Sequence, residues 1–292
     1  MGKGILVGIA TLNEVENIGE ILEKIFSLNY VSDVLIVDGN SNDGTLELIQ
    51  KLQVTQKNLH LIKQKEKMGL ASAHICIFKF ALDQDFSHLI TLDADTSHDP
   101  LEIPKFLSAL SNFPESSLII GSRYMRGGRT DNKGFRLLIS LVANKVASLV
   151  IGGQIHEYTT SFRLYNVEKL GLIDSGTLDS RGYSFFFRIM YELIRMKNQV
   201  VEVPIHFHER FKGKSKIPKT EVFKSLYELI LLRFKERKIG KALNAKLPKC
   251  ELCNSIFTVG LSNKSQHVKL VGNIINSLGY VVFCTVCGSI FE

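Results

Sequence analysis

The first 122 residues alternate between short apolar runs and amphipathic stretches, and this alternation allows few folds. Five apolar runs read as buried strands, at 4–10, 33–38, 58–63, 88–93 and 117–122. Apolar residues recur at helical spacing between them, as Ile18, Leu22 and Ile25 do. The helical stretches are 14–27, 43–52, 70–82 and 100–110. Strands that alternate with helices predict an α/β fold with a mainly parallel sheet and right-handed crossovers.

The pattern changes after about residue 130, and the chain reads as three parts. We expect helices at 135–151, 183–196 and 219–238, a short strand and helix within 158–173, and a strand at 200–207. A cysteine-bearing tail begins at Pro248. The predicted division is an α/β domain over 1–218, a basic amphipathic helix or linker over 219–247, and a small domain over 248–292.

Polar residues follow the predicted strands where each one ends. In open α/β sheets the ligand binds beyond the carboxyl ends of the strands. Thr11, Asp38, Asp93 and Arg123 come at or just after such ends. We therefore expect these four side chains to lie along one rim of the sheet.

The segment "LITLDADTSHDP" ends an apolar run with two carboxylates, Asp93 and Asp95. Two like charges this close repel each other, and burial increases the cost. Mg²⁺ or Mn²⁺ between them would remove the repulsion, because these ions favour carboxylate oxygens and bridge to substrate phosphates. The alternative is a helix cap with a turn, which suits Asp99 just before Pro100 and, in the segment 37–45, Asp43 or Asn42.

The formal net charge is +7, and the basic residues cluster at 123–136 and 210–246. Such clusters indicate an anionic partner, either a phosphate-bearing substrate, a membrane surface or nucleic acid, unless they form a solvated basic face. No run of about 18 uncharged apolar residues is present to span a bilayer. The helices expected at 135–151 and 222–234 could lie in the headgroup layer of a membrane. The alternatives are a buried core helix for the first and a solvated helix for the second.

Four of the five cysteines form two CxxC pairs. They are Cys250, Cys253, Cys284 and Cys287. Residues 1–14 do not read as a signal peptide, so we expect a reducing, cytosolic setting, where paired CxxC motifs favour a metal over disulfides. The spacing predicts a zinc-ribbon-like module with a structural Zn²⁺, and a redox dithiol is the lesser alternative.

Several motifs in order resemble those of the family 2 glycosyltransferases with the GT-A fold. They are "ATLNEVENI", "VDGNSNDGT", "KMGLASA", "LDADTSHDP", "IIGSRYMRGG", "FRLLISLVANKVA", "YTTSFRLY", "RGYSF" and "EVPIHFHERFKGKSK". More narrowly, the chain is similar to the polyprenyl-phosphate (dolichol-phosphate) mannose and glucose synthases. This resemblance implies a metal-dependent, inverting transfer of a hexose from GDP-mannose or UDP-glucose to a polyprenyl phosphate. It also implies a place on the cytosolic membrane face, by direct contact or through a membrane-protein partner.

The resemblance carries over to individual residues. The matching nucleotide-binding positions are Thr11, Asn13, Glu14 and Asp38, and the matching metal and diphosphate positions are Asp93 and Asp95. The matching acceptor-phosphate positions are Arg123, Arg136 and Ser140, and the basic loop that closes over the site matches Arg210, Ser215 and Lys216. Four positions depart from the family pattern: Gly39 replaces an Asp, Ser97 a Gln found in some relatives, Ser161 a Gly and Arg188 a Glu.

Two other functions compete with transfer to a lipid phosphate. A phosphate acceptor is already ionised, whereas a saccharide hydroxyl would need a general base, for which Glu157 is the candidate unless it is only an exposed loop residue. The second alternative is a non-catalytic zinc-ribbon adaptor. Nucleic acid is not an expected partner, because "CELCNSIF" lacks interleaved basic and aromatic residues.

Overall fold

The computed structural model describes residues 2–173, 184–196 and 198–209, the helical residues Tyr227, Ile230 and Leu231, and two short strands at 258–261 and 280–283. The chain divides into two compact units, residues 1–229 and 230–292. In the second unit, β10 (Thr258–Leu261) and β11 (Tyr280–Phe283) pair in antiparallel fashion. The four CxxC cysteines lie outside the described residues, as does most of the helix expected at 219–238. The zinc ribbon and the three-part division therefore stay predictions.

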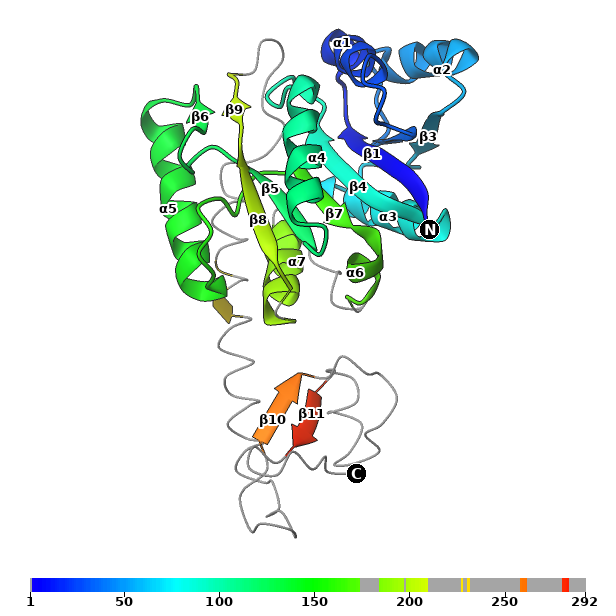
Figure 1. Ribbon diagram of the computed structural model, residues 1–292. Helices are drawn as coiled ribbons and strands as arrows, with labels where there is room; N and C mark the ends of the chain where they lie inside the picture. Colours follow the sequence, from blue (N-terminus) through cyan, green and yellow to red (C-terminus); the bar gives the residue numbers. More distant parts are fainter. Residues whose placement is uncertain are drawn as a thin grey trace. The chain divides into compact units, whose positions relative to one another are not determined.

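A seven-stranded sheet organises the first unit, in the order β3-β2-β1-β4-β7-β5-β8 (Figure 1). The strands are β1 (Lys3–Thr11), β2 (Asp33–Asp38), β3 (Leu59–Lys63), β4 (Phe86–Asp93), β5 (Leu118–Ser122), β7 (Arg163–Asn166) and β8 (Val200–Pro204). Only β7 runs antiparallel to its neighbours, β4 and β5, and every other pair in this sheet is parallel. The five strands predicted in the first 122 residues are confirmed, and the sheet is mainly parallel as expected.

Helices cover both faces of this sheet, which explains why all of β2 is buried. The helices are α1 (Val15–Phe26), α2 (Thr45–Thr55), α3 (Leu70–Asp83), α4 (Ile103–Asn112) after a 3₁₀ turn at Pro100–Glu102, α5 (Gly134–Ile151), α6 (Val167–Gly171) and α7 (Ser184–Arg195). On one face, apolar residues of α1, α2 and α4 share a core with β1, β2 and β4. On the other, Phe78 of α3 packs against Tyr165 of β7 and Phe185 of α7.

The segment 200–207 is split rather than one continuous strand, contrary to the sequence prediction. β8 ends at Pro204, and β9 (His206–Phe207) pairs in parallel with β6 (Arg129–Thr130) instead of continuing in the large sheet. The neighbouring strand β5 ends at Ser122, the partner of Pro204. Beyond this point the chain continues into β9, which lies beside β6 (Figure 1).

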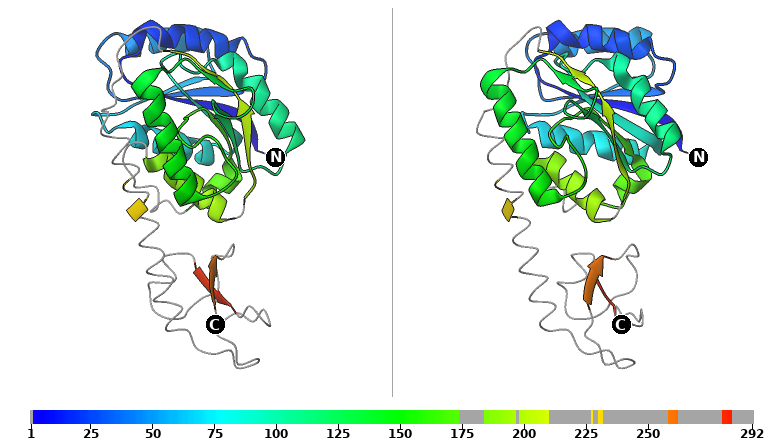
Figure 2. Two further views of the ribbon diagram at one scale, coloured as in Figure 1. Left: turned by 90° about the vertical axis from the view of Figure 1, so that its left-hand side faces the viewer. Right: turned by 60° about the vertical axis from the view of Figure 1, so that its left-hand side comes forward.

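Helix α5 lies on the outside of the first unit, against α7 (Figure 2). Its buried residues are Ala143, Asn144, Ala147 and Ile151, and on the other side of the helix Phe135, Leu138, Leu141, Val142 and Leu149 are exposed. Within the described residues, α5 is the one helix long and apolar enough to cross a membrane, with a mean hydropathy of 1.6. The core helices of soluble proteins pass the same test, so this finding alone does not place α5 in a bilayer.

Candidate active site

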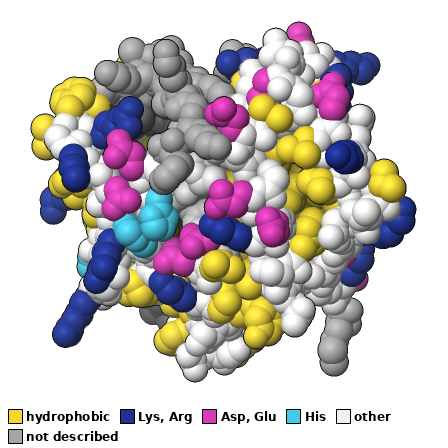
Figure 3. All heavy atoms as spheres, turned by 90° about the horizontal axis from the view of Figure 1, so that it is seen from above, with side chains coloured by type: hydrophobic (Ala, Val, Ile, Leu, Met, Phe, Trp, Pro, Cys, Tyr) yellow, Lys and Arg dark blue, Asp and Glu magenta, His cyan; other side chains and the backbone are white. Residues whose placement is uncertain are grey.

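The carboxyl ends of the strands bring the predicted site residues to one edge of the sheet. The register places Thr11 opposite Asp38, and Asp93 opposite Ala10. Arg123 directly follows the end of β5. Figure 3 views the molecule from this edge, where acidic, basic and histidine side chains lie side by side.

Asp38 holds the turn that follows β2. Its carboxylate accepts hydrogen bonds from the Thr11 hydroxyl (2.9 Å), the Ser41 amide (2.8 Å) and the Ser41 hydroxyl (2.6 Å). The Asp38 side chain is fully buried. In this structure Asp38 organises the loop predicted to meet the nucleotide, and its contact with the base stays a prediction.

The loop after β1 is tied to the loop after β2. Asn13 adopts a left-handed backbone conformation (φ 54°), and its side-chain oxygen accepts from the Asn42 amide. Asp43 accepts from the Thr45 amide at the start of α2 and from the Val15 amide at the start of α1. Burial would raise the pKa of Asp43, but the hydrogen bond from the Thr45 hydroxyl and those from the two amides outweigh it and lower the pKa. The residue at the N-cap of α2 is Gly44, not Asp43 or Asn42 as predicted, but Asp43 binds the first amide of both α2 and α1.

Glu14, the third predicted nucleotide contact of the first loop, faces inward. Its amide donates to the Thr45 hydroxyl, and its carboxylate accepts from the Asn17 side chain at 2.8 Å. Glu14 is buried next to the start of α1. These contacts give it a part in fixing the two loops, while its contact with a nucleotide stays a prediction.

The two predicted metal ligands are each held by a neighbouring donor. Asp93 ends β4, its side chain is about a third exposed, and its Oδ1 accepts from the Ser161 hydroxyl at 2.6 Å. Asp95 is buried, and its Oδ1 accepts from the Ser97 amide at 3.1 Å. Carboxylate oxygens fixed in this way are the donor set of a hard divalent cation such as Mg²⁺ or Mn²⁺. Of the two departures from the family pattern found here, Ser161 contributes its side-chain hydroxyl, whereas Ser97 contributes only its backbone amide.

His98 supports the backbone at the aspartate pair, a role that the sequence did not reveal. Its Nδ1 lies 3.3 Å from the Asp93 amide, and its Nε2 lies 3.2 Å from the Thr160 hydroxyl. Burial lowers the pKa of His98. The negative charges of Asp93 and Asp95 act in the other direction but do not outweigh burial. The ring is therefore neutral at pH 7, and the amide contact assigns its proton to Nε2. The contact between Nδ1 and the Asp93 carboxylate, at 3.6 Å, is then not an ion pair.

Arg123 and Glu157 form a buried, two-pronged ion pair. The Arg123 Nε donates to Glu157 Oε2 at 2.7 Å, and its Nη2 donates to Oε1 at 2.9 Å. The same carboxylate accepts from the amides of Thr159 and Thr160 and from the Thr159 hydroxyl. Burial alone would raise the pKa of Glu157, but the charge and hydrogen bonds of Arg123 outweigh it and lower the pKa.

The ion pair with Arg123 bears on both roles considered for Glu157, a general base and an exposed loop residue. The residue is not an exposed loop position, because its side chain is fully buried. Its carboxylate, occupied by five donors and lowered in pKa, is also poorly suited to accept a proton as a general base. Arg123 is committed to Glu157 and lies 4.9 Å from the centre of the Phe207 ring. Its binding of phosphate stays a prediction.

The remaining predicted residues lie on α5, on α7 or outside the described residues. Arg136 and Ser140 lie in the first two turns of α5, where Ser140 accepts from the Tyr124 hydroxyl at 2.8 Å. Arg188 pairs with Glu192 one turn along α7, at 3.1 Å. Arg210, Ser215 and Lys216 lie outside the described residues.

Sequence reasoning also missed a cluster of two histidines and a carboxylate at the same edge. Asp131, His206 and His208 each offer a ligand atom, and these atoms all lie within 4.8 Å of one another. The alternating pattern His-Phe-His at the end of the strand predicted at 200–207 was the available signal, because residues two apart in a strand share a face.

Comparison with known proteins identifies the family of the chain. Residues 6–172 match the family described as Glycosyl transferase family 2. The chain is 34% identical over 226 residues to the polyprenol monophosphomannose synthase of Mycolicibacterium smegmatis, covering 77% of this chain and 84% of the relative. It is 32% identical over 214 residues to the undecaprenyl-phosphate mannosyltransferase of Micrococcus luteus, covering 73% of this chain and 87% of the relative.

A solved structure confirms the predicted fold. Glucosyl-3-phosphoglycerate synthase from Mycobacterium tuberculosis, crystallised with Mn²⁺, UDP and its glucosylated product, superposes with a TM-score of 0.56 at 15% identity. The match covers 80% of each chain. At this identity the likeness speaks for the GT-A fold alone. The family match and the two relatives show that the chain belongs to glycosyl transferase family 2 and is a glycosyltransferase.

Proposed function

We propose that this enzyme transfers a hexose from a nucleoside-diphosphate sugar to a polyprenyl phosphate, with inversion at the anomeric carbon. The observation that carries the proposal is the aspartate pair at the end of β4, fixed by Ser97 and Ser161, in a chain about one-third identical to two polyprenyl-phosphate mannosyltransferases. The non-catalytic adaptor alternative is not retained, since the chain belongs to a transferase family and has both aspartates.

Asp93 and Asp95 would hold the Mg²⁺ or Mn²⁺. When bound, the ion neutralises the charge that builds up on the departing nucleoside diphosphate. The hydroxyl of Ser161 and the amide of Ser97 orient the two carboxylates, and neutral His98 fixes the backbone between β4 and α4. The loops at Asn13 and Asp38 would receive the nucleotide.

The state of Glu157 supports a phosphate rather than a hydroxyl acceptor. A phosphate monoester oxygen is ionised at neutral pH and attacks without a general base, which agrees with the engagement of Glu157 by Arg123. Attack in line with the departing diphosphate inverts the anomeric carbon. Arg136 at the start of α5, and Arg210 and Lys216 of the basic segment, are the cations proposed to hold the acceptor phosphate.

Mannose is the sugar we favour, with GDP-mannose as donor, because both relatives named above are mannosyltransferases. UDP-glucose is the alternative donor. The residues that would contact the base lie in the two loops at 11–14 and 38–41, which are preorganised by their own hydrogen bonds.

We also propose that α5 binds the membrane surface. Phe135, Leu138, Val142 and Leu149 recur at helical spacing on the exposed side of α5, and Lys145 lies among them. An apolar stripe with an accompanying cation fits the headgroup layer of an anionic bilayer. Since a polyprenyl phosphate resides in a membrane, this stripe would bring the site to its acceptor.

The experiment is a panel of labelled donors and acceptors with the full-length enzyme. GDP-[¹⁴C]mannose and UDP-[¹⁴C]glucose are each incubated with polyprenyl phosphate, with polyprenol lacking the phosphate, or with a free saccharide, in Mn²⁺ or in a chelator. We expect solvent-extractable label with GDP-mannose, polyprenyl phosphate and metal, and none with polyprenol. Label on the saccharide, or equal transfer to polyprenol, would contradict the proposal.

A further inference from the structure

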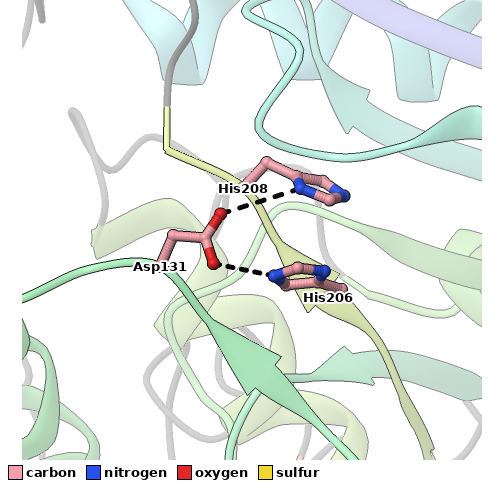
Figure 4. A group of neighbouring side chains, drawn as sticks. All are labelled: Asp131, His206 and His208. Carbon is pink, nitrogen blue, oxygen red and sulfur yellow. Dashed lines mark hydrogen bonds and ion pairs between the residues drawn. The ribbon is translucent and has the colours of Figure 1, made fainter.

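Three side chains from two distant segments meet beside the site and are not used by the proposed transfer: Asp131, His206 and His208 (Figure 4). Asp131 directly follows β6, and the histidines begin and follow β9. The two strands pair in parallel, with Arg129 opposite His206. The Asp131 amide also donates to the Phe207 carbonyl at 2.9 Å, so the backbone fixes the approach of the two segments.

The arrangement gathers nitrogen and oxygen donors at one point. His206 Nε2 lies 2.8 Å from Asp131 Oδ1, and His208 Nδ1 lies 3.7 Å from Asp131 Oδ2. The two imidazole rings are 4.0 Å apart between their centres. Their positions two residues apart in an extended segment put both on the same side of the chain, facing the carboxylate.

We propose that Asp131, His206 and His208 bind one divalent transition-metal ion, with Zn²⁺ the expected occupant, at a site separate from Asp93 and Asp95. Two imidazoles and a carboxylate are the ligands such ions prefer, whereas Mg²⁺ prefers oxygen alone. This site goes beyond the proposed transfer, which needs only the oxygen donors at the end of β4.

The distances and exposure suit an ion that enters from solvent. Ligand atoms on one zinc ion lie at most about 4.4 Å apart, twice the metal–ligand bond length, so the three atoms need only a small side-chain adjustment. The side chains are between 37% and 41% exposed, which gives an ion a path in and leaves room for water in the remaining positions. The Glu209 amide donates to Asp131 Oδ2 at 3.2 Å, which holds the carboxylate next to the two histidines.

The site is a neighbour of the aspartate pair but has its own donors. The His208 amide donates to the Ser97 carbonyl, and the Ser97 amide donates to Asp95. An ion bound by the cluster would tie β6 to β9 just before Arg210 in the sequence, where the predicted basic segment begins. The competing explanation is that the two histidines only hydrogen-bond to Asp131, and the experiment must separate it from metal binding.

The test titrates the full-length protein with Co²⁺. Excess Mg²⁺ is present throughout, because Mg²⁺ occupies sites built from oxygen alone and keeps Co²⁺ out of them. Co²⁺ bound by nitrogen and oxygen gives visible ligand-field bands, whereas thiolate ligands add an intense near-ultraviolet band that separates the tail cysteines. We expect the nitrogen and oxygen bands to titrate in wild type, and the affinity to fall about tenfold or more in His208→Asn and in Asp131→Asn.

Two matched variants complete the titration. His156→Asn alters a different histidine, which also pairs with a carboxylate, that of Glu202 at 2.8 Å. Asp95→Asn alters the proposed donor-metal site. Both should bind Co²⁺ as wild type does. The proposal is overturned if no such bands appear, if they persist in His208→Asn, or if Asp95→Asn removes them while Asp131→Asn does not.

A second measurement stands even if a cluster variant fails to fold. Crystals of the wild-type protein are soaked with Zn²⁺, and anomalous difference maps are collected on both sides of the zinc absorption edge. We expect a peak about 2.0 to 2.2 Å from the side chains of Asp131, His206 and His208. A map with zinc peaks only elsewhere, or with none, would overturn the proposal.

Discussion

Replacing Glu157 by glutamine tests whether this residue supports the site or acts as a base. The substitution keeps the shape of the side chain but leaves the Arg123 guanidinium buried without its counter-charge. Breaking a buried ion pair by removing one partner costs about 3–5 kcal/mol of the free energy of unfolding. At about 2–4 °C per kcal/mol for a domain of this size, the melting temperature should fall by about 6–20 °C.

The assay is urea-induced unfolding followed by circular dichroism, together with transfer kinetics over pH. Glu168→Gln, which removes an exposed carboxylate on α6, is the matched control and should change the free energy of unfolding by no more than about 0.5 kcal/mol. In Glu157→Gln the remaining activity should keep the wild-type pH profile. Wild-type stability combined with loss of the acidic limb of that profile, where a general base becomes protonated, would refute the reasoning and restore Glu157 as a base.

The pH dependence of stability gives the same test a second readout. Because the folded-state pKa of Glu157 is below the ordinary 4.5, its stabilisation is fully present above pH 4.5 and is lost as the pH falls through the folded-state value. Glu157→Gln should lack this loss. A variant that is destabilised by acid as strongly as wild type in that range would show that another group is responsible.

Three further changes probe the site, the core and the helix α5. Ser161→Ala removes the hydroxyl that fixes Asp93 and should raise the Mn²⁺ concentration for half-maximal transfer about tenfold, with little change in the rate at saturating metal; an unchanged metal requirement would contradict the positioning role. Burial lowers the pKa of His74 from 6.5 to about 3, so this group should reduce the free energy of unfolding of the wild type by about 2 kcal/mol between pH 6.5 and 5. In His74→Leu the free energy of unfolding, measured by urea titration at each pH, should depend less on pH over this range. An equal dependence in the variant would contradict the role of His74. Leu149→Glu places a charge on the exposed stripe of α5 and should weaken co-sedimentation with anionic vesicles about tenfold or more, whereas equal binding would exclude this face as the membrane contact.

Local patterns were sufficient to predict the layers of the fold. The first five strands and the helices between them each carry one strongly apolar face, and period-2 and period-3.6 patterns are readable without knowledge of the partners. The same spacing placed Thr11, Asp38, Asp93 and Arg123 at the ends of strands and hence at one edge of the sheet.

Pairings between distant segments were not readable in the same way. The short strand β7 inserts antiparallel between β4 and β5, which no local pattern encodes. Glu157 meets Arg123 across 34 positions of sequence, so neither its burial nor its lowered pKa was predictable. His98 and the Asp131 cluster escaped notice for the same reason, because their roles arise only when separate loops meet.

The most direct test of the central claim is a crystal structure of the enzyme with a nucleoside diphosphate and Mn²⁺, with anomalous data at the manganese edge. The account predicts a manganese peak bound by carboxylate oxygens of Asp93 and Asp95 and by diphosphate oxygens, with the nucleotide over the loops at Asn13 and Asp38. Asp95→Asn, prepared in parallel, should lose the peak and lipid-linked transfer while its melting temperature stays near that of wild type. A nucleotide bound with its diphosphate away from both aspartates, or full transfer by Asp95→Asn, would contradict the account.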